Sequence, residues 1–111
     1  MKKFFIFLVI LVLAAVACNI GQETQSEEAS AYETCQMYVT RALVSPSTAE
    51  FPSLAEVEVR KLSRNIFRIH AHVDSQNQFG AMVRSVYVCD IQRIGEDSWN
   101  LIELEFPFDQ N

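Results

Sequence analysis

The spacing of hydrophobic residues changes three times along the chain. An unbroken apolar run covers residues 4–17, and a polar stretch with three glutamates follows at residues 19–30. Apolar side chains then recur at helical spacing over residues 31–44, and four later stretches alternate between apolar and polar side chains. The pattern predicts a targeting segment at residues 1–17, a disordered tether at residues 18–30, and a single folded domain at residues 31–108.

The helix predicted for residues 31–44 has one apolar stripe. Its members follow the i, i+3, i+4, i+7, i+8 spacing: Cys35, Tyr38, Val39, Ala42 and Leu43. Ser30 is expected to cap the helix with Glu33 as its capping-box partner. Proline disfavours a helical conformation in the residue before it, so we expect the helix to end at Ser45 and Pro46. Phe51 is expected to anchor the connector that follows.

Four strands are predicted after the helix, at residues 56–62, 66–74, 81–91 and 99–106, with turns at residues 63–65, 75–80 and 95–98. The second strand alternates most sharply, with four side chains directed inward: Phe67, Ile69, Ala71 and Val73. The third is apolar on both faces and is expected to be central. One helix followed by four antiparallel strands (α-β-β-β-β) predicts an α+β domain with the helix packed on the sheet, a layout similar to that of cystatin-like folds.

The end of the first apolar run, Ala15-Val16-Ala17-Cys18, resembles the lipobox of bacterial lipoproteins. The run is shorter than the roughly 20 apolar residues of a bilayer-spanning helix, and with the lysines before it is typical of a secretory signal. The resemblance implies cleavage before Cys18, diacylation of its sulfur and acylation of the new amino terminus. Two other interpretations remain: a signal peptide cut after Ala17 that leaves Cys18 as a thiol, and an uncleaved anchor.

Lipidation of Cys18 would hold the protein on a membrane, because two acyl chains give stable anchoring. Asn19 follows the cysteine in place of the aspartate that is typical of inner-membrane lipoproteins, which favours the outer membrane where the host has one. We therefore expect a lipid-anchored cell-envelope protein whose domain faces the periplasm or the cell surface.

The charge of the chain argues against a nucleic-acid partner. Removing residues 1–17 removes two of the nine basic side chains and leaves 94 residues with seven basic and fourteen acidic side chains, a net charge of −7. The six arginines are scattered among acids, whereas phosphate binding needs clustered basic residues. We expect no binding to DNA or RNA.

The cysteine count predicts one disulfide. With Cys18 lipidated, Cys35 and Cys89 remain as an even pair in an exported protein. So small a domain buries a modest core and benefits from a covalent link, and Cys35–Cys89 would join the helix to the third strand. The alternative is two buried free thiols.

Three segments resemble a small domain that recurs at the C-terminal ends of bacterial and phage-encoded envelope proteins. They are Ser45 to Ser53 (SPSTAEFPS), Val73 to Arg84 (VDSQNQFGAMVR) and Val86 to Cys89 (VYVC). The likeness covers about residues 33–105. It implies the same fold and location, and it brings neither catalytic residues nor an assigned activity.

Candidate catalytic and metal-binding residues are few. His70, His72 and Asp74 share one strand face, and two imidazoles with a carboxylate could hold zinc. A solvated strand face is the preferred interpretation, because no third histidine exists. The disulfide would remove the thiol nucleophile, and neither a nucleophile elbow nor a phosphate-binding glycine loop is present. Glu103 and Glu105 are expected on the outer face of the last strand, and we expect no enzymatic activity and no cofactor.

The loop at residues 76–81 is the candidate contact region. Gly80 is expected to adopt a positive φ. Phe79 is either an exposed anchor for a partner or a plug over the end of the core, and the plug is preferred. Arg84 is expected to hydrogen-bond the loop from the next strand, so Phe79 and Arg84 are candidate partner contacts.

These expectations describe a non-catalytic binding module anchored to a membrane, whose partner is another envelope protein. The sheet face or the loop around Phe79 would make the contact. The alternative is an inhibitor, an immunity protein or a phage-exclusion lipoprotein that blocks another protein, which would also suit a small acidic domain with a disulfide.

Overall fold

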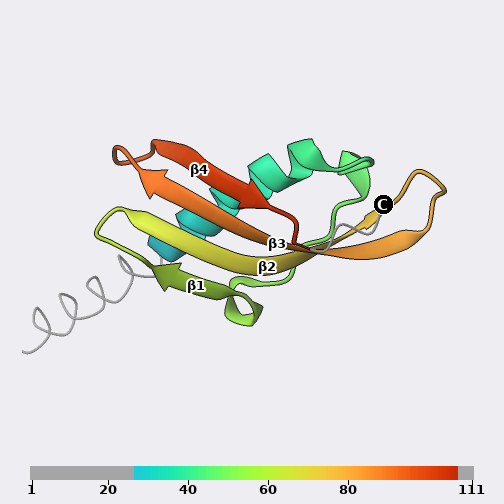
Figure 1. Cartoon of the computed structure of the whole chain (residues 1–111), viewed down its shortest axis with the longest axis horizontal. Coiled ribbons are helices and arrows are strands. Elements are labelled where there is room, and N and C mark those ends of the chain that lie inside the picture. Colours follow the sequence, from blue (N-terminus) through green and yellow to red (C-terminus); the bar gives the residue numbers. More distant parts are fainter. Residues whose placement is uncertain (1–26, 108–111) are drawn as a thin grey trace, which may run out of the picture.

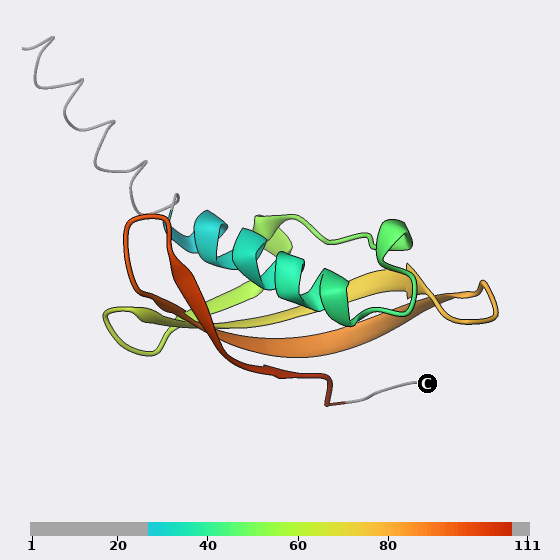
Figure 2. The ribbon, with the colours of Figure 1, turned by 90° about the horizontal axis from the view of Figure 1, so that it is seen from above.

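A helix lies across one face of a four-stranded antiparallel sheet (Figures 1 and 2). The computed structural model describes residues 27–107, and the helix covers residues 27–42. The strands are β1 (Glu58–Lys61), β2 (Ile66–Gln76), β3 (Met82–Arg93) and β4 (Trp99–Glu105), in the spatial order β1-β2-β3-β4. The predicted α+β layout is confirmed, with β3 between β2 and β4. The signal peptide, Cys18 and most of the expected tether lie outside the described residues.

The predicted start of the helix was wrong. Residues 27–30 are helical, so Ser30 is not the N-cap, and its carbonyl instead accepts a hydrogen bond from Thr34 Oγ1 at 2.8 Å. Glu27 forms ion pairs with Arg93 (3.3 Å) and Lys61 (3.8 Å), and acidic residues stabilise the first turn of a helix. The contacts come from strands distant in sequence, which local spacing cannot reveal.

The connector between helix and sheet contains two short 3₁₀ helices, η1 (Pro46–Thr48) and η2 (Leu54–Glu56). Between them, Glu50 exchanges both backbone hydrogen bonds with Asp74 of β2, at 2.8 and 3.0 Å. Phe51 is half-buried and packs against the core, as expected. The connector therefore covers the free edge of β2 near Asp74, on the side away from β3.

The core lies between the helix and the sheet. Its buried side chains come from both layers: Ala31, Tyr32, Cys35, Val39, Phe67, Ile69, Val73, Tyr87, Cys89 and Ile91. Aromatic contacts extend it, with ring centroids 5.7 Å apart for Phe67–Trp99 and 6.3 Å apart for Tyr87–Phe106. The alternation predicted for β2 is confirmed, with Ala71 half-buried at the margin.

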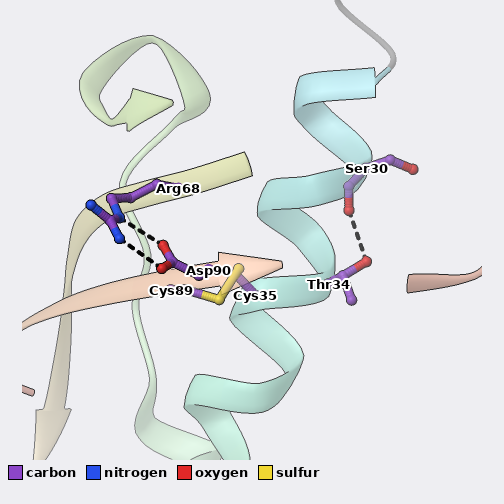
Figure 3. The surroundings of a disulfide bond; sticks show 6 residues. All are labelled: Ser30, Thr34, Cys35, Arg68, Cys89 and Asp90. Atoms are coloured by element: carbon purple, nitrogen blue, oxygen red, sulfur yellow. Dashed lines mark hydrogen bonds and ion pairs between the residues drawn. A yellow bond between two sulfur atoms is a disulfide. The ribbon is translucent and has the colours of Figure 1, made fainter. Parts of the chain in front are cut away.

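The predicted disulfide is present and joins the helix to the central strand (Figure 3). Cys35 and Cys89 are both fully buried, and their Cα atoms lie 6.2 Å apart. Close by, the Tyr32 hydroxyl donates to the Pro52 carbonyl at 2.6 Å, which ties the helix to the connector. Burial raises the pKa of Tyr87 far above its ordinary range.

The β2–β3 hairpin is longer than the strands beside it. β1 pairs only with residues 67–70 of β2, and β4 pairs only with residues 88–93 of β3. Beyond these limits β2 and β3 continue as a two-stranded ribbon to a turn at residues 77–81, the far end of the hairpin in Figure 1. The predicted turn began two residues too early, because pairing continues through Gln76 and Met82.

None of the helices within residues 27–107 has the length and apolar character that crossing a bilayer requires.

Candidate binding surface

We call the face of the sheet opposite the helix the outer face. It carries the polar side chains that the strand alternation predicted. The antiparallel register places β2 and β3 side chains in rows across this face: Arg68 beside Asp90, His70 beside Val88, His72 beside Val86, and Asp74 beside Arg84. Glu103 and Glu105 of β4 lie next to Asp90 and Val88. No helix covers this face among residues 27–107 (Figure 2), so its side chains are available to a partner.

Two bidentate ion pairs neutralise the arginines of the outer face. Arg68 donates from Nε and Nη2 to the Asp90 carboxylate, both at 2.8 Å (Figure 3), and Arg84 donates to Asp74 at 2.8 and 3.0 Å. The arginine hydrogen bonds lower the pKa of both Asp90 and Asp74. The expectation that Arg84 binds the loop was wrong: it binds the strand residue directly opposite.

The two histidines are half-buried between apolar neighbours on β3 and charged neighbours on β2. Asp74, the carboxylate proposed with them as a zinc ligand, is bound by Arg84. Among residues 27–107, no three or more His, Cys, Asp and Glu side chains are grouped to hold a metal ion.

One end of the outer face is acidic. A shallow hollow of about 220 Å³ is lined there by Arg68, His70, Val88, Asp90, Glu103 and Glu105. Asp90 is neutralised by Arg68, whereas the charge of Glu105 raises the pKa of Glu103. Glu103 and Glu105 add two further carboxylates to the Arg68–Asp90 pair, which leaves a net negative charge. This end of the face therefore favours a cationic group.

The turn at the other end of the hairpin is held by its own hydrogen bonds. Asn77 Oδ1 accepts from the backbone N–H of Phe79 at 2.9 Å and of Ala81 at 3.1 Å, and the Asn77 carbonyl accepts from Gly80 N–H at 3.0 Å. Gly80 has φ of 83°, as expected, which side chains rarely permit. The turn therefore has a defined shape.

Phe79 at this turn does not plug the core. Phe79 is 85% exposed, so the preferred prediction of a plug was wrong and the alternative, an exposed side chain, is what the structure shows. The ribbon carries the turn beyond the helix and the connector, which leaves nothing in residues 27–107 for the ring to cover. Phe79 is exposed because the β2–β3 hairpin is longer than the sequence pattern predicted.

Exposed apolar side chains recur from Phe79 along β3, on both sides of Arg84. Met82 is 50% exposed and Val86 is 41% exposed, both on the outer face. Contact through the sheet face was expected, but Met82 and Val86 were not predicted as contact residues. The third predicted strand has apolar residues on both faces. That pattern was interpreted only as a sign of a central strand, although it also placed apolar side chains on the outer face.

A second hollow lies on the inner side of the ribbon, at the end of the helix and near Phe106. Its volume is about 80 Å³, smaller than the hollow on the outer face.

No protein-family model, curated protein or solved structure matches the chain. Function is therefore inferred from the chain's own residues and surfaces.

Proposed function

We propose that this protein is a lipid-anchored bacterial envelope protein that binds another envelope protein without catalysis, through the β2–β3 turn and the outer face of its sheet. The observation that carries the proposal is Phe79, an aromatic ring 85% exposed at the end of a hydrogen-bonded turn. Exposed aromatic side chains are frequent anchors in protein interfaces, because burying one ring removes a large apolar area from water.

The shape of the turn supports this role. A partner that binds Phe79 need not order the loop, because Asn77 and Gly80 already fix its backbone. Ordering costs reduce affinity, so a preformed contact binds more tightly than a mobile one.

The direction of the hairpin also supports it. The start of the helix and the β2–β3 turn lie at opposite ends of the described domain (Figures 1 and 2). A chain anchored at Cys18, on the helix side, would therefore present the turn away from the membrane.

A second candidate function is inhibition, as an immunity or phage-exclusion lipoprotein. The observation that favours it is the narrow two-stranded ribbon beyond the sheet, which ends in a single aromatic ring and has the form of an element that enters a cleft. Stoichiometric loss of the activity of a bound enzyme or channel would distinguish inhibition from simple binding.

The test of binding is photo-crosslinking in cells that export the full chain. A photoreactive phenylalanine analogue replaces Phe79, and a matched variant carries it at Glu96, an exposed residue in the β3–β4 turn at the helix-start end. We expect a specific adduct with an envelope protein from position 79 and none from position 96. Equal labelling from both positions, or none from position 79, would contradict the proposal.

A quantitative test follows once the adduct is identified. Phe79→Ala should weaken binding to that protein by at least tenfold, as expected for loss of an aromatic anchor. The melting temperature should not change, because the ring makes no core contact. Unchanged affinity would assign the contact to another part of the surface.

A further inference from the structure

The part of β3 nearest the β2–β3 turn, Met82 to Tyr87, has one unpaired edge. β3 extends from Met82 to Arg93, and its pairing with β4 begins only at Val88. Phe106 still packs on Tyr87, but the chain turns at Pro107. Within residues 27–107, no strand lies beside the stretch from Met82 to Tyr87 on this side.

The register shows which backbone groups face this edge. Asn77 N–H bonds the Ala81 carbonyl, so odd-numbered residues of β3 direct their N–H and C=O groups toward β2. The even-numbered residues, Met82, Arg84 and Val86, direct theirs away from β2. These three N–H and three C=O groups form an unused ladder of the kind that accepts a further strand.

The opposite edge of the ribbon is covered. Glu50 bonds both backbone groups of Asp74, and Thr48 Oγ1 accepts from Gln76 N–H at 2.9 Å. The same two-stranded ribbon therefore has one closed edge and one open edge.

The open edge lacks the features that usually prevent pairing. Met82 to Tyr87 contains no proline and no lysine, and the only bulge of β3 lies further on, at Asp90 and Ile91. Its one charged residue, Arg84, is drawn back across the ribbon to Asp74. The side chains of Met82 and Val86 stay exposed beside the edge.

Charge selects the partner of this edge. A strand added antiparallel to β3 runs in the same direction as β4, and its N-terminal end meets Glu105. Glu105 and Glu103 lie on the outer face there, and neither forms an ion pair within residues 27–107. A second copy of the processed chain would bring another net charge of −7, seven basic against fourteen acidic side chains, whereas a basic segment would be attracted.

We propose that the open edge of β3 accepts an extended segment of a partner protein as a fifth strand, with alternate apolar side chains over Met82 and Val86 and a Lys or Arg at its N-terminal end beside Glu103 and Glu105. The proposal rests on the binding function proposed above and specifies its chemistry. The antiparallel arrangement follows because its ladder is the more stable one.

The test selects random twelve-residue displayed peptides on the full chain in detergent micelles, and measures the best synthetic peptide by calorimetry and amide hydrogen exchange. We expect peptides that alternate apolar side chains and carry a basic residue near the N-terminus. On binding, the amides of Met82, Arg84 and Val86 should gain protection. Ser85 N–H faces β2, so its exchange should not change.

Proline provides the decisive variant. Val86→Pro removes an N–H that has no internal partner, and proline is tolerated at such edge positions, so the melting temperature should be kept. Peptide affinity should fall at least tenfold. Val86→Thr keeps the N–H and should retain most of the binding, which separates backbone pairing from side-chain contact. Met82→Pro repeats the test if Val86→Pro fails to fold.

Several outcomes would overturn strand addition: no enriched peptide, equal affinity for Val86→Pro, or dimerisation of the full chain through the same amides. The proposal also fails if these amides are already protected in the free protein and lose that protection when residues 108–111 are deleted. That result would mean that the C-terminal residues of the chain cover the edge themselves. If Phe79 still crosslinks to its partner in Val86→Pro, the binding function stands and only strand addition fails.

Discussion

Carboxylates on the outer face of the sheet divide into two kinds. Asp74 and Asp90 each accept two hydrogen bonds from one arginine, and both have a lowered pKa. Glu103, beside Glu105, has a raised pKa. The first kind stabilises the fold when ionised, and the second is poised to receive a positive charge from outside.

Asp90→Asn tests the first kind. The folded pKa of Asp90 lies below its ordinary value of 3.8, so its pair with Arg68 stabilises the protein above that value and is lost as the pH falls through the lower folded pKa. We expect the variant to be less stable at pH 7 by about 1 kcal/mol, because Arg68 is partly exposed. Urea denaturation from pH 7 to pH 2.5 measures it. A difference between the two proteins that does not shrink as the pH falls below 3.8 would contradict this assignment.

Glu105→Gln tests the second kind. Removing the neighbouring charge should lower the pKa of Glu103 toward 4.5, as measured by carbon NMR titration of the side-chain carboxyl. Since a raised folded pKa disfavours the ionised native state, the variant should be slightly more stable than the natural protein near pH 7. Glu96→Gln, at a distant turn, should leave the pKa of Glu103 unchanged. A shift of equal size in both variants would assign the effect to overall charge.

At the scale of elements, the disulfide is the strongest single link between the helix and the sheet. It closes a loop with a sequence separation of 54 residues, and a cross-link of this length stabilises a domain by roughly 2–4 kcal/mol.

Replacing both cysteines, as Cys35→Ala and Cys89→Ala, should therefore lower the free energy of unfolding by about 2–4 kcal/mol. Both positions are fully buried, so the lost sulfur atoms add to the cost. Non-reducing thermal denaturation of the full chain measures the change. The natural protein treated with reductant should approach the stability of the variant, and an equal melting temperature under oxidising conditions would show that the bridge does not stabilise the fold.

The elements themselves were largely predictable from local spacing. The alternation in β2 and the apolar stripe at Cys35 and Val39 identified the core faces, and the two remaining cysteines identified the bridge. The start of the helix and the edge contact of Glu50 were not predictable. Both depend on residues distant in sequence, and the pattern of one segment carries no information about its neighbours in space.

The candidate surface was predicted less well. Phe79 was recognised, but its exposure depends on how far the hairpin extends beyond the helix. Arg84 was assigned to the loop, whereas the register places it opposite Asp74. The open edge at Met82 was not foreseen, because a missing neighbour is a property of the assembled sheet and leaves no trace in local composition.

At the scale of the whole molecule, the proposed attachment and the proposed contact lie at opposite ends. The helix starts at one end of the described domain, and the β2–β3 turn forms the other (Figure 2). This arrangement suits a protein held at its N-terminal side, and it makes the proposed lipid anchor a testable part of the function.

Cys18→Ala should release the protein from membranes. The substitution removes the sulfur that the lipobox resemblance assigns to diacylation, and an unlipidated domain lacks the acyl chains that give stable anchoring. Fractionation of exporting cells, with intact mass spectrometry of the membrane-bound form, measures both location and added acyl mass. A natural protein without acyl mass, or a variant that stays in the membrane fraction, would remove the anchor from the proposal.

The Cys35–Cys89 bridge has a mechanical consequence. Cys89 lies just beyond the open edge of β3, and Cys35 lies at the middle of the helix. Tension applied between the N-terminal side and a partner held at Val86 passes along β3 to Cys89, crosses the sulfur bridge to Cys35, and leaves through the start of the helix. Residues 36–81 lie off this load path. The bridge therefore provides a covalent bypass, so a pull transmitted along β3 would place no covalent tension on β2 or on the connector.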